Sequence, residues 1–143
     1  MKENKIQINF KKILNNAGLK NTLPRLTVLK ILSETKHPKT TKDIFNKLKK
    51  NDIDLVTLYR TLSSFEEKKI IKRVDLQKDA VYYELNTDHH HHIICTNCDK
   101  VADFVDENHE KLITKALAQV KNFKSITSHS FDLFGICNSC SAK

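Results

Sequence analysis

The sequence predicts a two-domain α+β protein, with a winged helix-turn-helix domain in residues 1–86 and a small α/β domain in residues 87–143. Three observations predict this fold class. First, the first part carries 19 basic and 10 acidic side chains, whereas the second carries 6 basic and 7 acidic ones. Second, helical hydrophobic periodicity in the first part is followed by two short strand-like runs. Third, all four cysteines and six of the seven histidines lie in the second part, which indicates metal binding there.

Four segments of the first part have the periodicity and the terminal residues of helices. The first runs from about Gln7 to Ala17 and ends at Gly18, a residue that commonly stops a helix. The second runs from Pro24 to about Glu34, since proline suits the first helical turn. The third begins near Thr40, where Asp43 lies three residues on and gives a pattern close to a capping box.

The fourth helix is expected after Asp52 and Asp54, which are both suitable N-caps. The apolar residues that should pack inward are Leu55, Leu58, Leu62 and Phe65. The residues expected on the opposite face are Thr57, Arg60, Thr61 and Ser64, with Tyr59 on the flank. This face is small, polar and basic and has no carboxylate. Such a face is typical of a helix that enters the major groove of DNA, because phosphates repel carboxylates.

Two short strands are predicted after the fourth helix, at Ile70–Val74 and Val81–Leu85, around a turn at Gln77–Asp79. Three helices, a recognition helix and a basic hairpin together make a winged helix-turn-helix. The positive charge of this part fits a polyanionic partner such as nucleic acid. The alternative is an ordinary small α+β domain with a solvated lysine surface.

The cysteines form two CxxC pairs, Cys95 with Cys98 and Cys137 with Cys140, separated by 38 residues. Four thiolates on one tetrahedral ion suit zinc, and a closed site of this kind is structural. A disulfide or a redox CxxC is the alternative. We expect a cytoplasmic chain with reduced cysteines, because the sequence has no signal-peptide run and no apolar stretch of the roughly 18–20 residues that cross a bilayer.

A run of four histidines, residues 89–92, precedes Ile93 and Ile94, which suggest a strand. Because side chains alternate along a strand, His90 and His92 should face one side, and His89 and His91 the other. Candidate ligands for the first site are Glu84, His37 and Asp103. Candidates for the second site are Glu110, His109 and His129. Imidazole and carboxylate donors suit Fe(II), Mn(II), Co(II) or Zn(II), whereas a solvated or hydrogen-bonded histidine cluster is the alternative.

The remaining chain predicts a helix over about Asp106–Phe123 and a strand over Ile126–Ile136. The apolar stripe of this helix comprises Leu112, Ile113, Ala116, Leu117 and Val120. A strand, a helix and a strand in so short a segment leave an exposed edge or apolar face. We therefore expect self-association to cover it.

Taken together, these residues closely resemble the ferric uptake regulator family of metal-dependent bacterial transcription factors, over roughly Ala17 to Cys140. The order and spacing of six stretches carry the resemblance. They are AGLK (17–20), TLPR (22–25), TLYRTL (57–62), YEL (83–85), the histidine run with ICTNC (94–98), and CNSC (137–140). The resemblance implies an N-terminal winged helix, a C-terminal α/β dimerisation domain with structural zinc, and a homodimer or a tetramer that binds double-stranded operator DNA.

The resemblance also implies roles for individual residues. The structural zinc ligands are Cys95, Cys98, Cys137 and Cys140. The regulatory metal ligands are His37, Glu84, His90 and His92, with Asp103 as a further carboxylate. The ligands of a second metal site are His89, His91, Glu110 and His129. The residues that contact DNA are Lys20, Tyr59 and Arg60, with Arg25 and Thr57 nearby.

The implied function is a metal-responsive regulator, most like the iron-sensing branch, in which Fe(II) activates a repressor of metal-uptake genes and Mn(II), Co(II) or Zn(II) are possible substitutes. Glu84 stands where peroxide-sensing members tend to carry aspartate, and His91 where iron-sensing members often do. Zinc-sensing members usually place a thiol in the regulatory site, whereas all four cysteines here belong to the CxxC pairs. Peroxide, zinc or manganese sensing stays the alternative within the family. A metal-buffering protein or a metalloenzyme is the alternative outside it.

Overall fold

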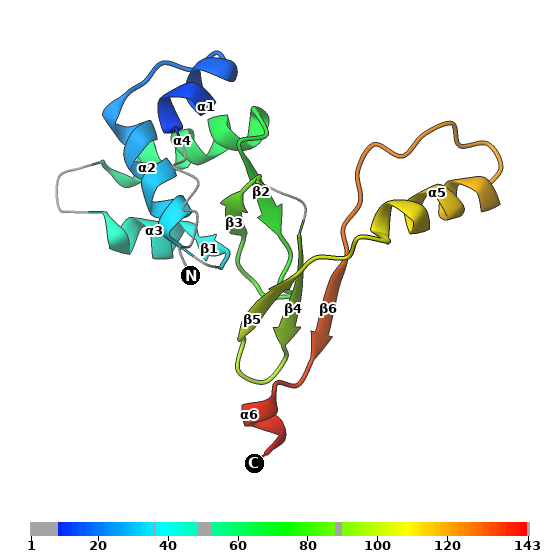
Figure 1. Cartoon of the computed structure of the whole chain (residues 1–143). Coiled ribbons are helices and arrows are strands. Elements are labelled where there is room, and N and C mark those ends of the chain that lie inside the picture. Colours follow the sequence, from blue (N-terminus) through cyan, green and yellow to red (C-terminus); the bar gives the residue numbers. More distant parts are fainter. Residues whose placement is uncertain (1–8, 36, 49–52, 88–89, 143) are drawn as a thin grey trace, which may run out of the picture. The chain divides into compact units, whose positions relative to one another are not determined.

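The computed structural model describes residues 9–35, 37–48, 53–87 and 90–142, and the chain forms two compact units, Met1–Thr87 and Asp88–Lys143 (Figure 1). Each unit is described here by itself. The helices of the first unit are α1 (Phe10–Asn16), α2 (Leu23–Glu34), α3 (Thr41–Lys47) and α4 (Leu55–Glu67). Its strands are β1 (Lys39–Thr40), β2 (Ile71–Val74) and β3 (Tyr82–Leu85).

Side-chain caps determine where three of these helices begin. The Asn9 side chain accepts a hydrogen bond from the Lys12 N–H at the start of α1. At α3, Thr40 and Asp43 form the predicted capping box, with hydrogen bonds in both directions. Asp54 caps α4 by accepting from the Thr57 N–H over 2.6 Å. Asp52, the other predicted cap, lies outside the described residues.

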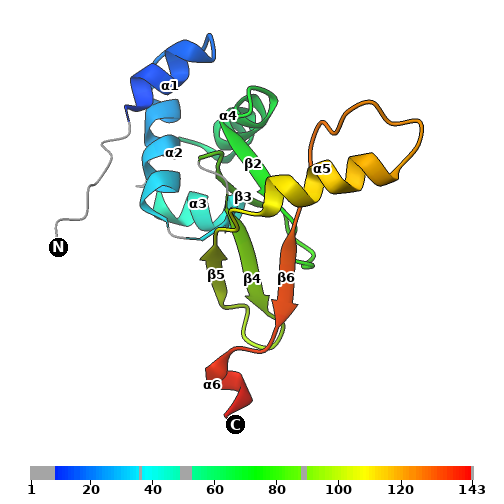
Figure 2. The ribbon, with the colours of Figure 1, turned by 45° about the vertical axis from the view of Figure 1, so that its right-hand side comes forward.

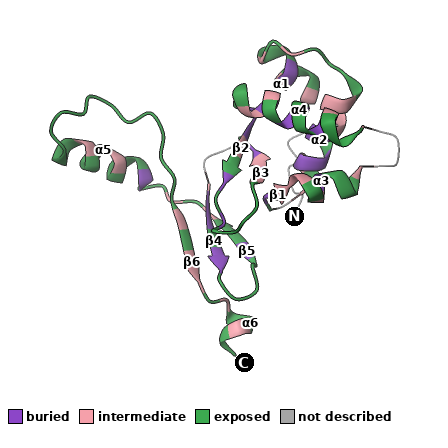
Figure 3. Ribbon diagram, turned by 180° about the vertical axis from the view of Figure 1, so that it is seen from behind, coloured by how far each residue is buried: buried purple, intermediate pink, exposed green. Residues whose placement is uncertain are grey.

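The core of the first unit lies between α1, α2, α3, α4 and the small sheet, where the buried parts of the ribbon lie together (Figure 3). Its fully buried side chains include Leu14, Leu29, Ile44, Leu58 and Phe65. Gly18 has φ +71°, a conformation that favours glycine, and lets the chain leave α1. Burial of these apolar groups is what holds the short helices together, because isolated helices of this length are marginal in water.

The sheet of the first unit has the strand order β1-β3-β2, and all neighbours are antiparallel. The β2–β3 hairpin was predicted, whereas the two-residue β1 was not. In the hairpin register, Lys72 lies opposite Glu84 and Arg73 opposite Tyr83. This register places Lys72 and Glu84 on the same face of the hairpin.

The second unit is built on a sheet of β4 (His91–Cys95), β5 (Val101–Phe104) and β6 (Asp132–Gly135), with α5 (His109–Gln119) and α6 (Asn138–Ser141). The strand order is β5-β4-β6, with β4 in the centre (Figure 2). Strand β4 is antiparallel to β5 and parallel to β6. The centre of the sheet therefore carries His91 and His92 and ends at Cys95.

Two predicted elements of this unit are shorter than expected. Helix α5 starts at His109 rather than near residue 106, because the Asp106 side chain accepts from the Asn108 N–H over 2.8 Å and holds that segment in a turn. The predicted strand Ile126–Ile136 was wrong over its first half, since β6 pairs with β4 only over four residues. Residues 121–131 are exposed and carry no strand, while β5 and α6 were not predicted.

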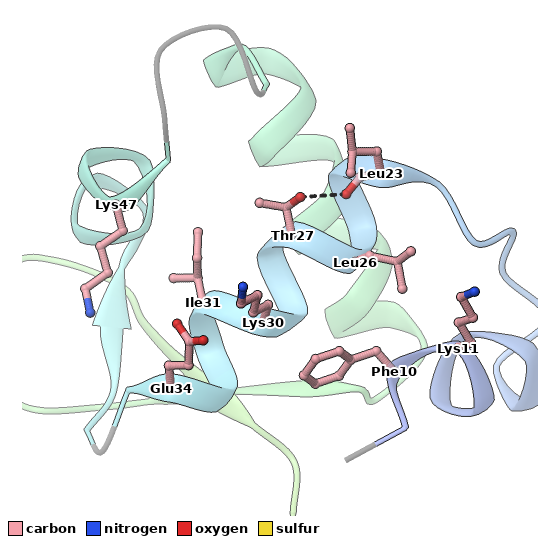
Figure 4. A pocket seen from close by; sticks show the side chains of 9 residues that line it. All are labelled: Phe10, Lys11, Leu23, Leu26, Thr27, Lys30, Ile31, Glu34 and Lys47. Carbon is pink, nitrogen blue, oxygen red and sulfur yellow. Dashed lines mark hydrogen bonds between the residues drawn. The ribbon is translucent and has the colours of Figure 1, made fainter. Parts of the chain in front are cut away.

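No helix within the described ranges is both long and apolar enough to cross a membrane. A hollow of about 660 Å³ lies along α2, between Phe10 of α1 and Lys47 of α3 (Figure 4). The described residues that line it are apolar, Lys, Thr or Glu side chains, with no His, Cys or Ser among them. This lining offers neither a thiol nor an imidazole for catalysis or metal binding.

Candidate metal centres and nucleic-acid interface

The two CxxC pairs converge into one cluster at the end of β4 and the start of α6. The four sulfur atoms all lie within 4.8 Å of one another, and the Cys98 and Cys137 sulfurs are 3.6 Å apart. Zinc–sulfur bonds of about 2.3 Å place the sulfurs of a tetrahedral site about 3.8 Å apart. All four cysteines are free thiols, without a disulfide. The donor set and its spacing therefore fit a four-sulfur metal site.

Backbone N–H groups of both knuckles stabilise thiolates. The pKa of the Cys95 thiol is lowered to about 6, first by the Cys137 N–H, which donates to the sulfur over 3.3 Å. The Cys140 N–H lowers the pKa of Cys137 in the same way. The pKa of Cys98 is raised to about 12, because the three neighbouring thiols together outweigh the favourable Lys100 N–H. Four thiols this close cannot all ionise without a cation, which is the electrostatic reason for a metal here.

His92 lies between two carboxylates from the neighbouring strands. Its Nδ1 is 3.2 Å from Oδ1 of Asp132 in β6, and its Nε2 is 3.7 Å from Oδ1 of Asp103 in β5. The His92 ring is buried, and the His90 ring contacts its edge with centroids 5.0 Å apart. Asp103 was a predicted candidate. Asp132 was missed, although it is the one carboxylate in the apolar run from Phe131 to Ile136.

His91 faces the opposite side of β4, as strand alternation requires, and joins a cluster of aromatic rings. Its ring centroid lies 4.4 Å from that of His109 and 6.3 Å from that of His129. Phe104 and Phe131 enclose these imidazoles, at 5.4 and 5.3 Å from His91. Three imidazoles surrounded by phenyl rings offer nitrogen donors in an apolar environment.

The other residues predicted for the second site have different positions. Glu110 is exposed in the first turn of α5. His89 lies outside the described residues. His109, one of the candidates from the residue pattern but not from the resemblance, is buried against both His91 and His129. In the sequence, its position directly before the predicted ligand Glu110 is the signal that marks His109 as a candidate ligand.

In the first unit, the Glu84 carboxylate forms an ion pair with Lys72 across the β2–β3 hairpin. The Lys72 Nζ is 3.2 Å from the Glu84 Oε1, and 12% of the Glu84 side chain is exposed. A carboxylate this sheltered needs a cation or hydrogen-bond donors to remain ionised. His37 is exposed in the loop between α2 and β1. Glu84 and His37, two of the predicted regulatory ligands, both belong to the first unit.

The outward face of α4 differs from the prediction at several residues, and only Arg60 and Tyr59 of the predicted outer residues are exposed. Thr61 was expected outside, but it is only 6% exposed and its hydroxyl donates to the Thr57 carbonyl over 2.8 Å. Leu55 was expected inside, but it is 44% exposed. The exposed residues of α4 are Leu55, Val56, Tyr59, Arg60, Ser63 and Glu67, whereas Thr57 and Ser64 of the predicted face are half-buried. Thr61 is small enough to pack inward, because its hydroxyl already has a hydrogen-bond acceptor within the helix. The exposed side of α4 is therefore centred on Tyr59 and Arg60.

The turn before α2 brings two further predicted DNA contacts together. The Arg25 guanidinium donates to the Lys20 carbonyl over 3.0 Å, which ties the start of α2 to the preceding loop. Lys20 and Arg25 thus lie on one short segment, and α4 supplies Tyr59 and Arg60 as exposed side chains. The predicted contact Thr57 is half-buried, with its N–H bound to the cap.

Comparison with known proteins agrees with this reading. The model of the ferric uptake regulator family matches residues 16–134. The ferric uptake regulation protein of Legionella pneumophila is 37% identical over 131 residues, which cover 89% of this chain and 95% of that protein. The structure of the Vibrio cholerae ferric uptake regulator is 32% identical, covers 90% of this chain and all of that chain, and has a TM-score of 0.72.

A structure of the ferric uptake regulator from Francisella tularensis with iron is 34% identical, covers 87% of this chain and 96% of that chain, and has a TM-score of 0.71. These likenesses extend through both units. They agree with the winged-helix and α/β architecture predicted from the sequence. The members of this family are transcription regulators and not enzymes. The chain belongs to the ferric uptake regulator family of metal-responsive, DNA-binding transcription regulators.

Proposed function

We propose that this protein is a repressor of metal-uptake genes that Fe(II) activates, with Mn(II), Co(II) and Zn(II) as possible substitutes. One observation carries the proposal. The four thiols form a cluster of their own, so the donors left for a regulatory ion are nitrogen and oxygen atoms, such as the His92–Asp103 pair. Such donors suit Fe(II) and Mn(II), whereas thiolates favour zinc.

The proposed structural ion is Zn(II), held by Cys95, Cys98, Cys137 and Cys140. The convergence of the four sulfurs and the N–H donors to Cys95 support this role. The cluster joins the end of β4 to α6, two segments about 40 residues apart in the sequence. The binding free energy of an ion held by both segments contributes directly to folding, because the unfolded chain has no such site.

The proposed regulatory ligands come from both units of the chain. His37 and Glu84 belong to the DNA-binding unit, and the others, His90, His92 and Asp103, belong to the second unit. An ion bound by this set supplies a cross-link between the two. Secondary structure positions these ligands: the β2–β3 hairpin carries Glu84, and the pairing of β4 with β5 places His92 beside Asp103.

A second metal site is proposed at His89, His91, Glu110 and His129, with His109 as an additional donor. The support is the close approach of the rings of His91, His109 and His129. A donor set made mostly of imidazole nitrogens favours Zn(II) or Co(II) over Fe(II). This site is therefore proposed to bind its ion more permanently than the regulatory site does.

The proposed operator contacts are Lys20, Arg25, Thr57, Tyr59 and Arg60. Exposure of the Arg60 and Tyr59 side chains on α4 supports base readout in the major groove. Lysines of the first unit supply phosphate contacts, whose strength falls as salt rises. Val56, 59% exposed beside Tyr59, adds an apolar group suited to a thymine methyl.

The proposed assembly is a homodimer, or a tetramer made of two dimers, on a palindromic operator. The second unit exposes a set of large apolar side chains, namely Leu112, Val120, Phe123, Ile126, Leu133 and Ile136. A partner surface is what large exposed apolar side chains require in order to be covered. A second copy would cover them and would space two copies of α4 for successive grooves.

Operator binding by zinc-loaded protein, with and without Fe(II) under anaerobic conditions, tests the proposal. Fluorescence anisotropy should report tighter operator binding with Fe(II), by about 5- to 150-fold for a typical coupling. His90→Ala should abolish this increase and keep the fold, whereas exposed Glu107→Gln serves as a matched control. Stimulation by Zn(II) but not by Fe(II) would indicate a zinc sensor, and equal affinity with every ion would contradict metal-dependent regulation.

A further inference from the structure

The sheet of the second unit places one imidazole between two carboxylates on the same face. In the register of the sheet, His92 of β4 lies opposite Asp103 of β5 and opposite Asp132 of β6. Residues directly opposite each other on adjacent strands project to the same face. The three side chains therefore form a row across the three strands, with His92 in the middle.

The two carboxylates stand in different relations to the ring. Asp132 Oδ1 is 3.2 Å from Nδ1, which is the distance of a hydrogen bond. Asp103 Oδ1 is 3.7 Å from Nε2, beyond hydrogen-bond length. That separation is close to the spacing of two donors that share one cation, about 3 Å or a little more for bonds near 2.1 Å.

Burial makes the contact with Asp132 strong. His92 is 3% exposed, and the side chain of Asp132 is 19% exposed. A hydrogen bond to a carboxylate is stronger than a neutral one, and it strengthens further when water is excluded. A carboxylate accepts and does not donate, so the hydrogen in this bond belongs to Nδ1 of the ring.

We propose that Asp132 is a positioning residue that keeps His92 protonated at Nδ1, so that Nε2 presents its lone pair beside Asp103 to the regulatory ion. In a neutral imidazole one nitrogen carries the hydrogen and the other is the donor to a metal, and the hydrogen bond of one selects the other. Carboxylates that hold ligating histidines in this way commonly set metal affinity. This inference rests on the regulatory role proposed for His92.

Direct ligation by Asp132 to the same ion is disfavoured by the same geometry. Asp132 lies at the Nδ1 edge of the ring, whereas Asp103 lies at the Nε2 edge. The two edges of an imidazole point in different directions, so an ion bound at Nε2 is out of reach of a carboxylate hydrogen-bonded at Nδ1. Asp132 therefore acts through His92.

The first experiment measures the tautomer of His92 by nitrogen-15 NMR in the full chain, with zinc in the cysteine cluster and no other metal, at a pH where imidazole is neutral. Wild-type protein and the control Glu107→Gln should show His92 with the hydrogen on Nδ1. Asp132→Ala should lose this preference. Asp132→Asn keeps a carbonyl acceptor and should retain it, which separates the hydrogen bond from any general disturbance of β6.

The second experiment titrates Mn(II) into the same proteins by calorimetry. Asp132→Ala should weaken binding at the regulatory site by about 10- to 100-fold, and Asp132→Asn by less, with zinc content unchanged. Wild-type affinity and an unchanged tautomer in Asp132→Ala would overturn the inference. His92→Ala distinguishes the proposed role of Asp132 from the proposed regulatory site. If His92→Ala binds Mn(II) with wild-type affinity, His92 is not a ligand of the regulatory ion, and the proposed site is wrong whatever the effect of Asp132→Ala.

Discussion

Replacing Lys72 with methionine should destabilise the first unit by about 2 kcal/mol and should tighten binding of the regulatory ion. The Lys72 ammonium is 3.2 Å from the Glu84 carboxylate, and the two residues lie opposite each other in the β2–β3 hairpin. Methionine keeps most of the apolar stem of lysine and removes the charge. The change therefore leaves a sheltered carboxylate without this cation.

The magnitude follows from the distance and the exposure of the two side chains. Unit charges at this separation attract by about 5 kcal/mol at an effective dielectric constant near 20, and by about 1.3 kcal/mol in bulk water. The side chain of Glu84 is 12% exposed and that of Lys72 is 36% exposed, so the pair lies between these limits. Desolvation of both groups offsets part of the attraction, which leaves a net loss of about 2 kcal/mol.

Urea unfolding monitored by tyrosine fluorescence measures this loss in the first unit alone. The chain has no tryptophan, and its three tyrosines, Tyr59, Tyr82 and Tyr83, all belong to residues 1–87. With m unchanged, a shift in the transition midpoint gives the change in the free energy of unfolding. Lys30→Met, which removes another surface lysine from the same unit, is the matched control and should change stability by less than about 0.5 kcal/mol.

A double-mutant cycle with Glu84→Gln gives the result that would refute this reasoning. If the loss arises from the ion pair, Lys72→Met should cost little once Glu84 is already neutral. An equal loss in both backgrounds would mean that the lysine acts through packing and not through its charge. Lys72→Arg keeps a cation and should restore most of the stability.

The same pair has a consequence for metal binding. A cation that binds Glu84 competes with Lys72 for the carboxylate, so removal of the lysine favours the ion. If the whole 2 kcal/mol is transferred, the affinity for Mn(II) or Fe(II) rises about 30-fold. Unchanged affinity in Lys72→Met, with the stability loss still present, would argue against Glu84 as a metal ligand.

Three further predictions concern the other parts of the molecule. Cys137→Ser should lower bound zinc to below one ion per chain at the cysteine cluster and unfold the second unit, as measured by elemental analysis and circular dichroism; a folded, zinc-free second unit would contradict it. Arg60→Ala should weaken operator binding by about 1–3 kcal/mol in anisotropy titrations, whereas Thr61→Val, at a buried position, should not. The Thr40 N–H lowers the pKa of Asp43 below its ordinary 3.8. The ionised carboxylate therefore stabilises α3 above pH 3.8, and this contribution is lost as the pH falls through the lowered pKa. Asp43→Ala should lower the free energy of unfolding by about 1 kcal/mol at pH 7, and urea unfolding at a series of acidic pH values should show a weaker pH dependence in this variant.

Much of the fold follows from signals only a few residues long. The Thr40–Asp43 capping box and the Asp54 cap lie within one helical turn of the groups they bind, so the sequence alone determines where α3 and α4 begin. The two CxxC pairs have the same property, because each knuckle places its sulfurs together whatever the rest of the chain does. The four helices of the first unit, the β2–β3 hairpin, the zinc-type cluster and the family were predictable for this reason.

Features that join distant segments were not predictable in this way. Strand pairing with β4 extends over only four residues of β6, and it brought Asp132 to His92 across 40 residues of sequence. The core decided which face of α4 is outward, since Thr61 could pack inside once its hydroxyl was satisfied. A shift of one residue in strand register reverses every side chain. The sequence by itself therefore determined the start of α3 and α4, the two CxxC pairs and the family, because these signals are local. Only the tertiary structure decided which carboxylate meets which histidine, because strand pairing joins distant segments.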